Sequence, residues 1–402
     1  MTGGNPVRKH CSAFGIFRIF LRLGLTSFGG PIAHLGYFRQ EFVLRRKWLD
    51  EHAYAELVGL CQFLPGPASS QCGFALGLSQ RGLAGGLAAW LGFTLPSAIL
   101  LFAFALAAAA FTGAMALAAL HGLKIVAVAI VAQAVWGMAR TLTPDARRIA
   151  IAAAALAVSL VTGTSGQFIA IALGATAGLL LCRGIVQPQG GGLSFSISRA
   201  SGLASLGLFL LLLLGGPLLS AHAGNHALAV FNAFYRSGAL VFGGGHVVLP
   251  LLSDALVRPG WISPESFLAG YGAAQAVPGP LFTVSAYLGA MLNAPPHGLA
   301  GALLALTAIF LPGMLLVTGT LPFWDSLRSR PDMQAAMRGI NAAVVGILAA
   351  ALYSPLWTGA IESGWDIALA GAGFLLLTLA RFQPWKIVTG TVAAALLLAA
   401  LR

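Results

Sequence analysis

A chain of 402 residues in which 58% are hydrophobic and only 8% are charged differs from soluble domains, where about 25% are charged. The net charge of +12 comes from Lys and Arg at segment ends and in short loops, a placement that reports membrane topology. No aromatic-basic interleaving or nucleic-acid module accompanies it, so DNA or RNA binding is not expected. The 4 cysteines form no C-x-x-C pair and no His-Cys cluster, which leaves metal sites and disulfides unsupported.

Continuous apolar runs rich in Leu, Ala and Gly predict membrane-spanning helices. The clearest are residues 83–111, 118–139, 201–219 and 298–320, each near the roughly 20 residues that cross about 30 Å of hydrocarbon. Strands of a β-barrel would alternate in polarity, which these runs do not. We therefore expect an all-α polytopic protein of the cytoplasmic membrane, with about ten to twelve membrane-embedded segments. The first helix lacks an A-x-A cleavage site and is expected to be retained.

The chain repeats itself. FRIFLRLGLTSFGG at 17–30 aligns with FNAFYRSGALVFGG at 231–244, and a Pro-Gly-Pro tripeptide follows each copy in the same order. Colinear matches of Arg, Trp, Gln and Pro are not expected by chance in a Gly- and Leu-rich chain. The sequence thus predicts two related domains, 12–183 and 225–402, joined by a linker at 184–224 that includes an extra apolar segment.

Charge placement predicts that the two halves are inverted relative to each other. The basic loops are 33–51 and 140–148 in the first half but 321–334 and 381–386 in the second, at positions that do not correspond. This swap is what the positive-inside rule predicts for an inverted repeat. Whether 201–219 crosses the membrane stays open, because a full crossing would make the halves parallel.

Each half contains a pair of short helices interrupted by Pro-Gly-Pro. The pairs are 52–64 with 68–80 and 264–277 with 281–292; at about 13 residues such helices are too short to span, and proline breaks the helix. Unpaired backbone at membrane depth is tolerated only where it is buried in protein or lines a cavity. We therefore predict that the two breaks are non-helical tips lying close together near the midplane, with helix N-termini that suit an anion.

These stretches resemble the chromate ion transporter family, whose longer members carry a duplicated domain. The resemblance rests on FGGPIAHLGYFRQEFV, ELVGLCQFLPGPASSQCGFALG, FGGGHVVLPLL and AAQAVPGPLFTVSAYLG. It implies a secondary transporter that exports chromate, with sulfate as the similar dianion, in exchange for protons. It implies a small oxyanion and the lipid bilayer as partners, no cofactor and no enzymatic activity.

The candidate substrate-binding residues flank the breaks or place a polar group inside an apolar helix. Arg22 and Arg236 occupy equivalent positions, where a guanidinium is costly unless it is paired or faces a cavity, and its fork suits a tetrahedral oxyanion. Lys124, opposite Asn341 in the repeat, offers a second positive charge; the alternatives are a charge that balances Glu56 or one near the interface. The full set is Arg22, Gly29, Gly30, Gln62, Pro65, Gly66, Pro67, Ser69, Ser70, Lys124, Arg236, Gly243, Gly244, Gln275, Pro278, Gly279, Pro280 and Thr283. A structural arginine or an interhelical hydrogen bond is the alternative for the arginines and glutamines.

Three residues are candidates for proton coupling. Glu56 is the acidic residue in the apolar part of the first interrupted pair, and its alternative is a pair with a loop arginine. His34 and His246 follow the two Phe-Gly-Gly elements and could shuttle protons, or could be polar loop histidines.

Two other functions remain as alternatives. One is transport of sulfate or another small anion. The other is a membrane-embedded enzyme acting on a lipid-linked substrate, which no H-E-x-x-H or G-x-S-x-G motif supports. No G-x-x-x-x-G-K-[ST] loop is present, so ATP is not expected to drive transport within this chain. The oligomeric state, a homodimer included, is left open.

Overall fold

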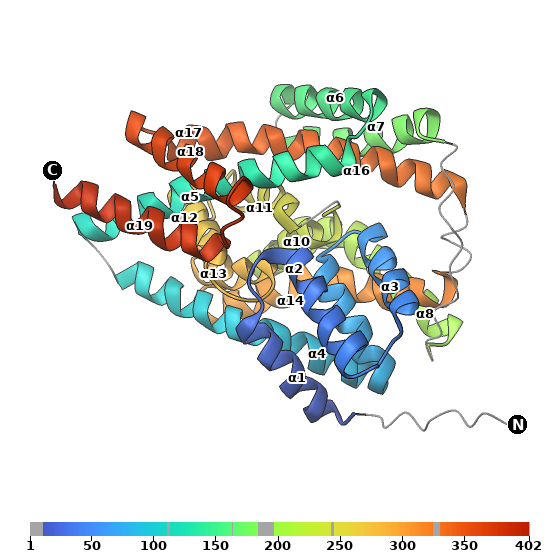
Figure 1. Cartoon of the computed structure of the whole chain (residues 1–402). Coiled ribbons are helices and arrows are strands. Elements are labelled where there is room, and N and C mark those ends of the chain that lie inside the picture. Colours follow the sequence, from blue (N-terminus) through green and yellow to red (C-terminus); the bar gives the residue numbers. More distant parts are fainter. Residues whose placement is uncertain are drawn as a thin grey trace, which may run out of the picture.

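The computed structural model describes residues 11–110, 113–162, 164–183, 197–242, 245–324 and 330–401. The described residues are helices and connecting segments, with no strand among them (Figure 1). Up to the linker the helices are α1 (Ala13–Thr26), α2 (Gly30–Phe38) with its π-helical continuation η1 (Arg39–Arg45), α3 (Glu51–Phe63), α4 (Ala68–Ala110), α5 (Ala114–Leu142), α6 (Ala146–Thr162) and α7 (Thr164–Leu181).

After the linker the described helices are α8 (Arg199–Leu210), η2 (Leu211–Gly215), α9 (Gly216–Ala223), α10 (His226–Ala239), η3 (Gly245–Val247), α11 (Val248–Leu256), α12 (Pro264–Ala274), η4 (Leu281–Thr283), α13 (Val284–Ala290), α14 (Gly298–Thr320), η5 (Leu321–Phe323), α16 (Pro331–Ala351), η6 (Leu352–Trp357), α17 (Thr358–Ala360), α18 (Gly364–Thr378) and α19 (Pro384–Ala400).

Five of these helical stretches are long and apolar enough to cross a membrane, judged by length and composition. They are Ala68–Ala108, Met115–Leu142, Arg199–Ser220, Gly298–Phe323 and Pro331–Ala360. The all-α membrane architecture is thereby confirmed. The extra apolar segment forms α8, η2 and α9 in sequence, and only 11% of its most apolar window is buried inside the protein. Most of its residues are therefore exposed or half-buried, as in a helix that packs on one side and faces lipid on the other.

The helices are interrupted at both Pro-Gly-Pro sequences, and the interruptions have local causes. The helix before each break begins at an equivalent capping residue: the Asp50 carboxylate accepts from the amide of Ala53 at 2.8 Å, and the Ser263 hydroxyl accepts from the amide of Ser266 at 3.2 Å. The prolines then end each helix. In the second half the chain resumes as the 3₁₀ turn η4 before α13, not as the single helix over 281–292 that the sequence predicts.

The helix after each break turns back on itself at a pair of glycines. A Cβ atom on Gly77 would overlap the carbonyl oxygen of Gly85 across the kink in α4, and one on Gly289 would overlap that of Gly301 between α13 and α14. The α4 kink lies at Arg81 and Gly82, where the backbone leaves the helical region. Backbones this close exclude any side chain, which is how small residues pack membrane helices.

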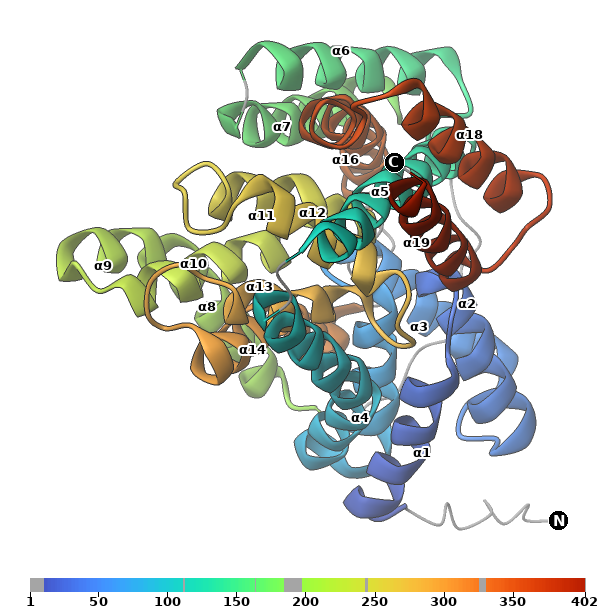
Figure 2. The ribbon, with the colours of Figure 1, turned by 90° about the vertical axis from the view of Figure 1, so that its left-hand side faces the viewer.

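Helices of each half pack against helices of the other half. Helix α5 of the first half packs against α18 and α19 of the second, whereas α16 of the second half packs against α6 and α7 of the first (Figures 1 and 2). Glycines permit both contacts, since Gly122 in α5 faces the backbone of α19 and Gly178 in α7 faces the backbone of α16. Within each half, α1 packs on α4 and α10 on α14.

The glycine pair at the kink gives a stability prediction. We expect Gly77→Ala to lower the free energy of unfolding by about 1–3 kcal/mol, because backbone cannot yield to the new methyl group. Gly207→Ala in α8 is the control, because a Cβ there meets nothing within 4 Å. The melting temperatures of the detergent-purified variants decide it, and a Gly77→Ala protein as stable as the control would refute the packing described.

Candidate functional site

Each Pro-Gly-Pro loop is bonded to the Phe-Gly-Gly element of the other half. The amide of Gly66 donates to the carbonyl of Val241 at 2.7 Å, and the amide of Gly279 donates to the carbonyl of Ser27 at 2.9 Å. Both glycines have positive φ, 125° and 101°, which side-chain-bearing residues rarely adopt. The two loops are thus held by reciprocal backbone hydrogen bonds between the halves.

Further contacts bring the two Pro-Gly-Pro loops and the two Phe-Gly-Gly elements close to one another. A Cβ atom on Gly245 would lie 3.5 Å from Pro31 Cγ, which brings the two Phe-Gly-Gly elements into contact. Gly66 packs against Gly313 of α14, and Gly279 packs against Ser97 of α4, again at equivalent positions. We call this region the break cluster; it comprises residues 27–31, 65–67, 241–242, 245 and 278–280. Gly243 and Gly244 lie outside the described residues.

Buried polar atoms without partners gather on the first-half side of the break cluster. Ser69 Oγ lies 3.4 Å from Nδ1 of His34, and both side chains are buried. Ser27 Oγ, His34 Nε2 and Ser70 Oγ are shielded from solvent and have no hydrogen-bond partner among the described residues. The amides in the first turn of α4 lack partners within the helix, and the dipole there is positive. Such groups are normally satisfied, so this side has the capacity to hydrogen-bond an anion or water.

The second-half side is more nearly satisfied by the protein itself. The hydroxyl of Thr283, fully buried, donates to the carbonyl of Pro280 at 2.6 Å. His246 Nδ1 lies 2.7 Å from the hydroxyl of Tyr271. Gln275 is half-buried at the end of α12, with its side chain beside the hydroxyl of Tyr271. Equivalent positions in the two halves therefore differ in what they offer a ligand.

Gln71 is a residue of this site that the sequence analysis missed. Its side chain is buried, and Nε2 donates to the carbonyl of Pro65 at 2.9 Å and reaches that of Gly313 at 3.5 Å. It therefore ties the first Pro-Gly-Pro loop to α14. A glutamine inside an apolar helix is a signal in itself, but Val284 stands at the equivalent position, so a comparison of the two halves does not find it.

Arg22 lies in a second place, a cleft of about 380 Å³ between α1 and η1. Arg18, Arg45 and Arg46 line the same cleft together with Glu41. Partial burial opposes ionisation of Glu41, but hydrogen bonds from Arg46 and Arg45 outweigh it and hold the pKa of this carboxyl below its ordinary value. Four arginines facing one carboxylate leave the cleft strongly positive. We call it the basic cleft.

Three other predicted residues, Arg236, Gln62 and Glu56, have different surroundings. Arg236 stacks its guanidinium over the ring of Phe168 at 5.1 Å, unlike its repeat mate. Gln62 is exposed on α3, and Glu56 is half-buried there. Gly29 and Gly30 belong to the break cluster, with φ of 103° and 76°.

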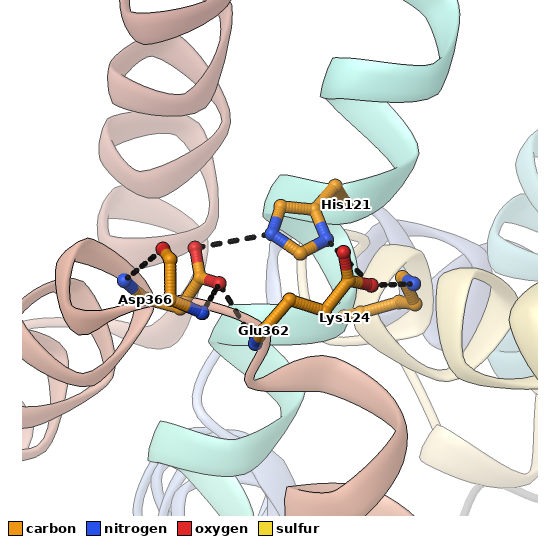
Figure 3. A network of polar contacts seen from close by, with 5 residues as sticks. His121, Lys124, Glu362 and Asp366 are labelled. Carbon is orange, nitrogen blue, oxygen red and sulfur yellow. Dashed lines mark hydrogen bonds and ion pairs between the residues drawn. The ribbon is translucent and has the colours of Figure 1, made fainter.

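Lys124 is paired with a residue from the other half. Its Nζ lies 3.4 Å from Glu362 Oε1, in a cavity of about 530 Å³ that His121, Glu265 and Asp366 also line (Figure 3). The pair with Glu56, considered as an alternative on sequence grounds, is replaced by this one. Glu362 lies too far along the chain for any local pattern to indicate the contact.

Comparison with known proteins agrees with this duplicated arrangement. The family model described as "Chromate transporter" matches residues 14–179 and again residues 228–399. The chain belongs to the chromate transporter family.

Relatives within the chromate transporter family match most of the chain. It is 28% identical over 336 residues to a probable chromate transport protein of Synechococcus elongatus, covering 83% of this chain and 82% of the relative. It is 26% identical over 375 residues to a chromate transport protein of Pseudomonas aeruginosa, covering 90% and 86%. An uncharacterised transporter of Bacillus subtilis is 30% identical over 163 residues, which are 87% of that protein but 39% of this chain. No solved structure matches this chromate transporter family member.

Removing Gln71 should loosen the first loop. We expect Gln71→Ala to lower the free energy of unfolding by about 1–3 kcal/mol, since a buried carbonyl loses its donor. Gln62→Ala, an exposed glutamine on the preceding helix, should change the melting temperature little. Equal melting temperatures for the two variants would show that Gln71 does not hold the loop.

Proposed function

We propose that the chain is a secondary transporter that moves chromate, or a similar tetrahedral dianion, across the cytoplasmic membrane. The observation that supports this most lies at the edge of the break cluster, beside the N-terminus of α4. There Ser27 Oγ, His34 Nε2 and Ser70 Oγ are buried and have no hydrogen-bond partner within the described part of the chain. The relatives named as chromate transport proteins supply the substrate. Sulfate has the same shape and charge, so the same groups would bind it, and competition between the two anions is expected.

The chemistry of the break cluster suits a dianion. Hydroxyls, backbone amides and an imidazole can each donate a hydrogen bond to an oxyanion, and bonds to a charged acceptor are about twice as strong as neutral ones. The positive end of α4 adds a fixed electrostatic attraction. In a site shielded from water this attraction is screened less than at the surface.

The basic cleft would collect the anion before it reaches the break cluster. Clefts lined by one sign of charge raise the local concentration of a counter-ion and its association rate. Arg45 and Arg46 close the basic loop that the positive-inside rule assigns to the cytoplasm. We take the collecting surface to lie on the cytoplasmic side, which favours export as the proposed direction of transport.

Proton exchange is the proposed driving reaction, with His34, His246 and Glu56 as the candidates. His34 is the most direct of the three, because it contacts Ser69 at the start of α4. A proton on this imidazole would add positive charge beside the anion and strengthen its binding. Each chain carries the break cluster whole, so a homodimer would hold two sites.

Substitutions at Ser70 and Thr283 distinguish a role in anion binding from a role in stabilising the fold. We expect Ser70→Ala to lower chromate flux about tenfold with an unchanged melting temperature, because its hydroxyl has no described protein partner to lose. Thr283→Val, at the equivalent position, should instead lower the melting temperature, because it removes the bond to Pro280. Flux into proteoliposomes, normalised to folded protein, is the measurement. Normal flux in Ser70→Ala would remove α4 from the site.

Arg22 tests the basic cleft. Loss of a charge-assisted contact of about 1.5–3 kcal/mol predicts that Arg22→Ala lowers chromate flux ten- to a hundredfold, and that Arg22→Lys restores part of it, since lysine keeps the charge but not the fork. Arg236→Ala, which loses a stacking contact instead, should affect flux less. The idea fails if Arg22→Ala transports normally per folded molecule, or if it loses flux only because it is misfolded.

A further inference from the structure

Away from the break cluster and the basic cleft, a network of ionisable side chains joins the two halves (Figure 3). His121 of α5 places Nε2 3.0 Å from Oδ1 of Asp366 and Nδ1 3.8 Å from Oε1 of Glu362. Lys124, one turn further along α5, reaches the same Oε1 at 3.4 Å. Both carboxylates belong to the second half, at the start of α18.

Asp366 is held in place by the backbone. Its Oδ2 accepts from the amides of Glu362 at 2.9 Å and Ser363 at 2.8 Å, and Ser363 completes a capping box at the start of α18. These bonds favour the ionised carboxylate. Oδ1 is then an acceptor, so His121 must carry a hydrogen on Nε2 to bond with it. Nδ1 is left as the ring atom that can gain or lose a proton.

The protonation of Nδ1 decides whether His121 and Glu362 attract. Without a proton, the lone pair of Nδ1 faces a carboxylate oxygen 3.8 Å away; with one, the same contact becomes an ion pair. Lys124 on α5 faces Glu362 and Asp366 from the α18 side and Glu265 from α12, so three carboxylates are set against one lysine. Helix α19 adds apolar side chains.

The equivalent interface in the other half cannot respond in this way. The register that places Asn341 opposite Lys124 places Arg338 opposite His121. Arg338 donates to the carbonyl of Cys182 at 2.9 Å and to Gln334 at 3.1 Å, and a guanidinium does not lose its proton in proteins. At these matched positions α5 carries a group that can titrate and α16 carries one that cannot.

We propose that His121 and Glu362 form a proton-binding site whose occupancy sets how firmly α5 is held to the second half. The cavity of about 530 Å³ gives water access to the pair. When Nδ1 is protonated, the imidazole of His121 pairs with both Glu362 and Asp366. When the proton leaves, the imidazole keeps only its hydrogen bond to Asp366. Any effect on anion movement rests additionally on the proposed function.

The site is tested first by nitrogen NMR of the imidazoles in the full-length protein, with the His121 signal assigned from His121→Gln. We expect the Nδ1 signal to change with pH while Nε2 keeps its hydrogen. Glu362→Gln should alter the pH dependence of the Nδ1 signal, because the negative partner is lost. His297→Gln, at an exposed position before α14, should not move it. An unmoved titration in Glu362→Gln, or exchange of the hydrogen on Nε2, would overturn the proposal.

Stability and transport supply independent readouts. The bound proton favours the folded state, so its stabilisation is present at low pH and lost as pH rises through the titration. The melting temperature of wild type should therefore exceed that of His121→Gln by more at pH 5.5 than at about pH 8, and an equal difference at both values contradicts the proposal. In proteoliposomes, we expect the wild-type protein to transport chromate and the His121→Gln variant to show a weaker dependence of chromate flux on pH. If the pH dependence of flux is the same in His121→Gln as in wild type, the proton site does not act on transport. If wild type carries no chromate but the NMR result is as expected, the proposed function is refuted and the proton site is not.

Discussion

The fold depends on the need to pair backbone amides where helices are broken inside a membrane protein. Two Pro-Gly-Pro loops free donors that lipid cannot satisfy, and neither half supplies the acceptor for its own loop. Gly66 bonds to the carbonyl of Val241 and Gly279 to that of Ser27, each across the halves. The halves therefore complete each other, and Ser69 and Ser70 at the N-terminus of α4 are buried.

The backbone follows the repeat, but the side chains do not. At the N-terminus of α4 the buried hydroxyl of Ser70 has no hydrogen-bond partner among the residues described, whereas Thr283 donates its hydroxyl to its own loop. Arg22 joins the basic cleft, whereas its mate Arg236 stacks on an aromatic ring. In the proposed function, the two specialised halves supply different surfaces: the basic cleft would collect the anion, and the interface between α5 and α18 would bind a proton.

Much of the fold could be predicted because its causes are local. Proline, glycine and capping residues mark the ends of the short helices, and α3, expected over 52–64, spans Glu51–Phe63. Pairings between distant segments could not be predicted in this way. Lys124 lies beside Glu362, and Gln71 reaches Gly313, because helices from opposite halves pack together. No periodicity near either residue carries that information, and the repeat hides Gln71 because a valine replaces it in the second copy.

The central claim is that the break cluster binds the dianion. The most direct measurement is an experimental structure of the full-length protein in lipid with chromate present, in which the heavy chromium atom marks the anion. The account predicts density beside the first turn of α4, within hydrogen-bonding distance of Ser70 Oγ, and replacement of the chromium signal by a weaker peak when sulfate is added in excess. Chromate found in the basic cleft alone, with the break cluster filled by water, would contradict it.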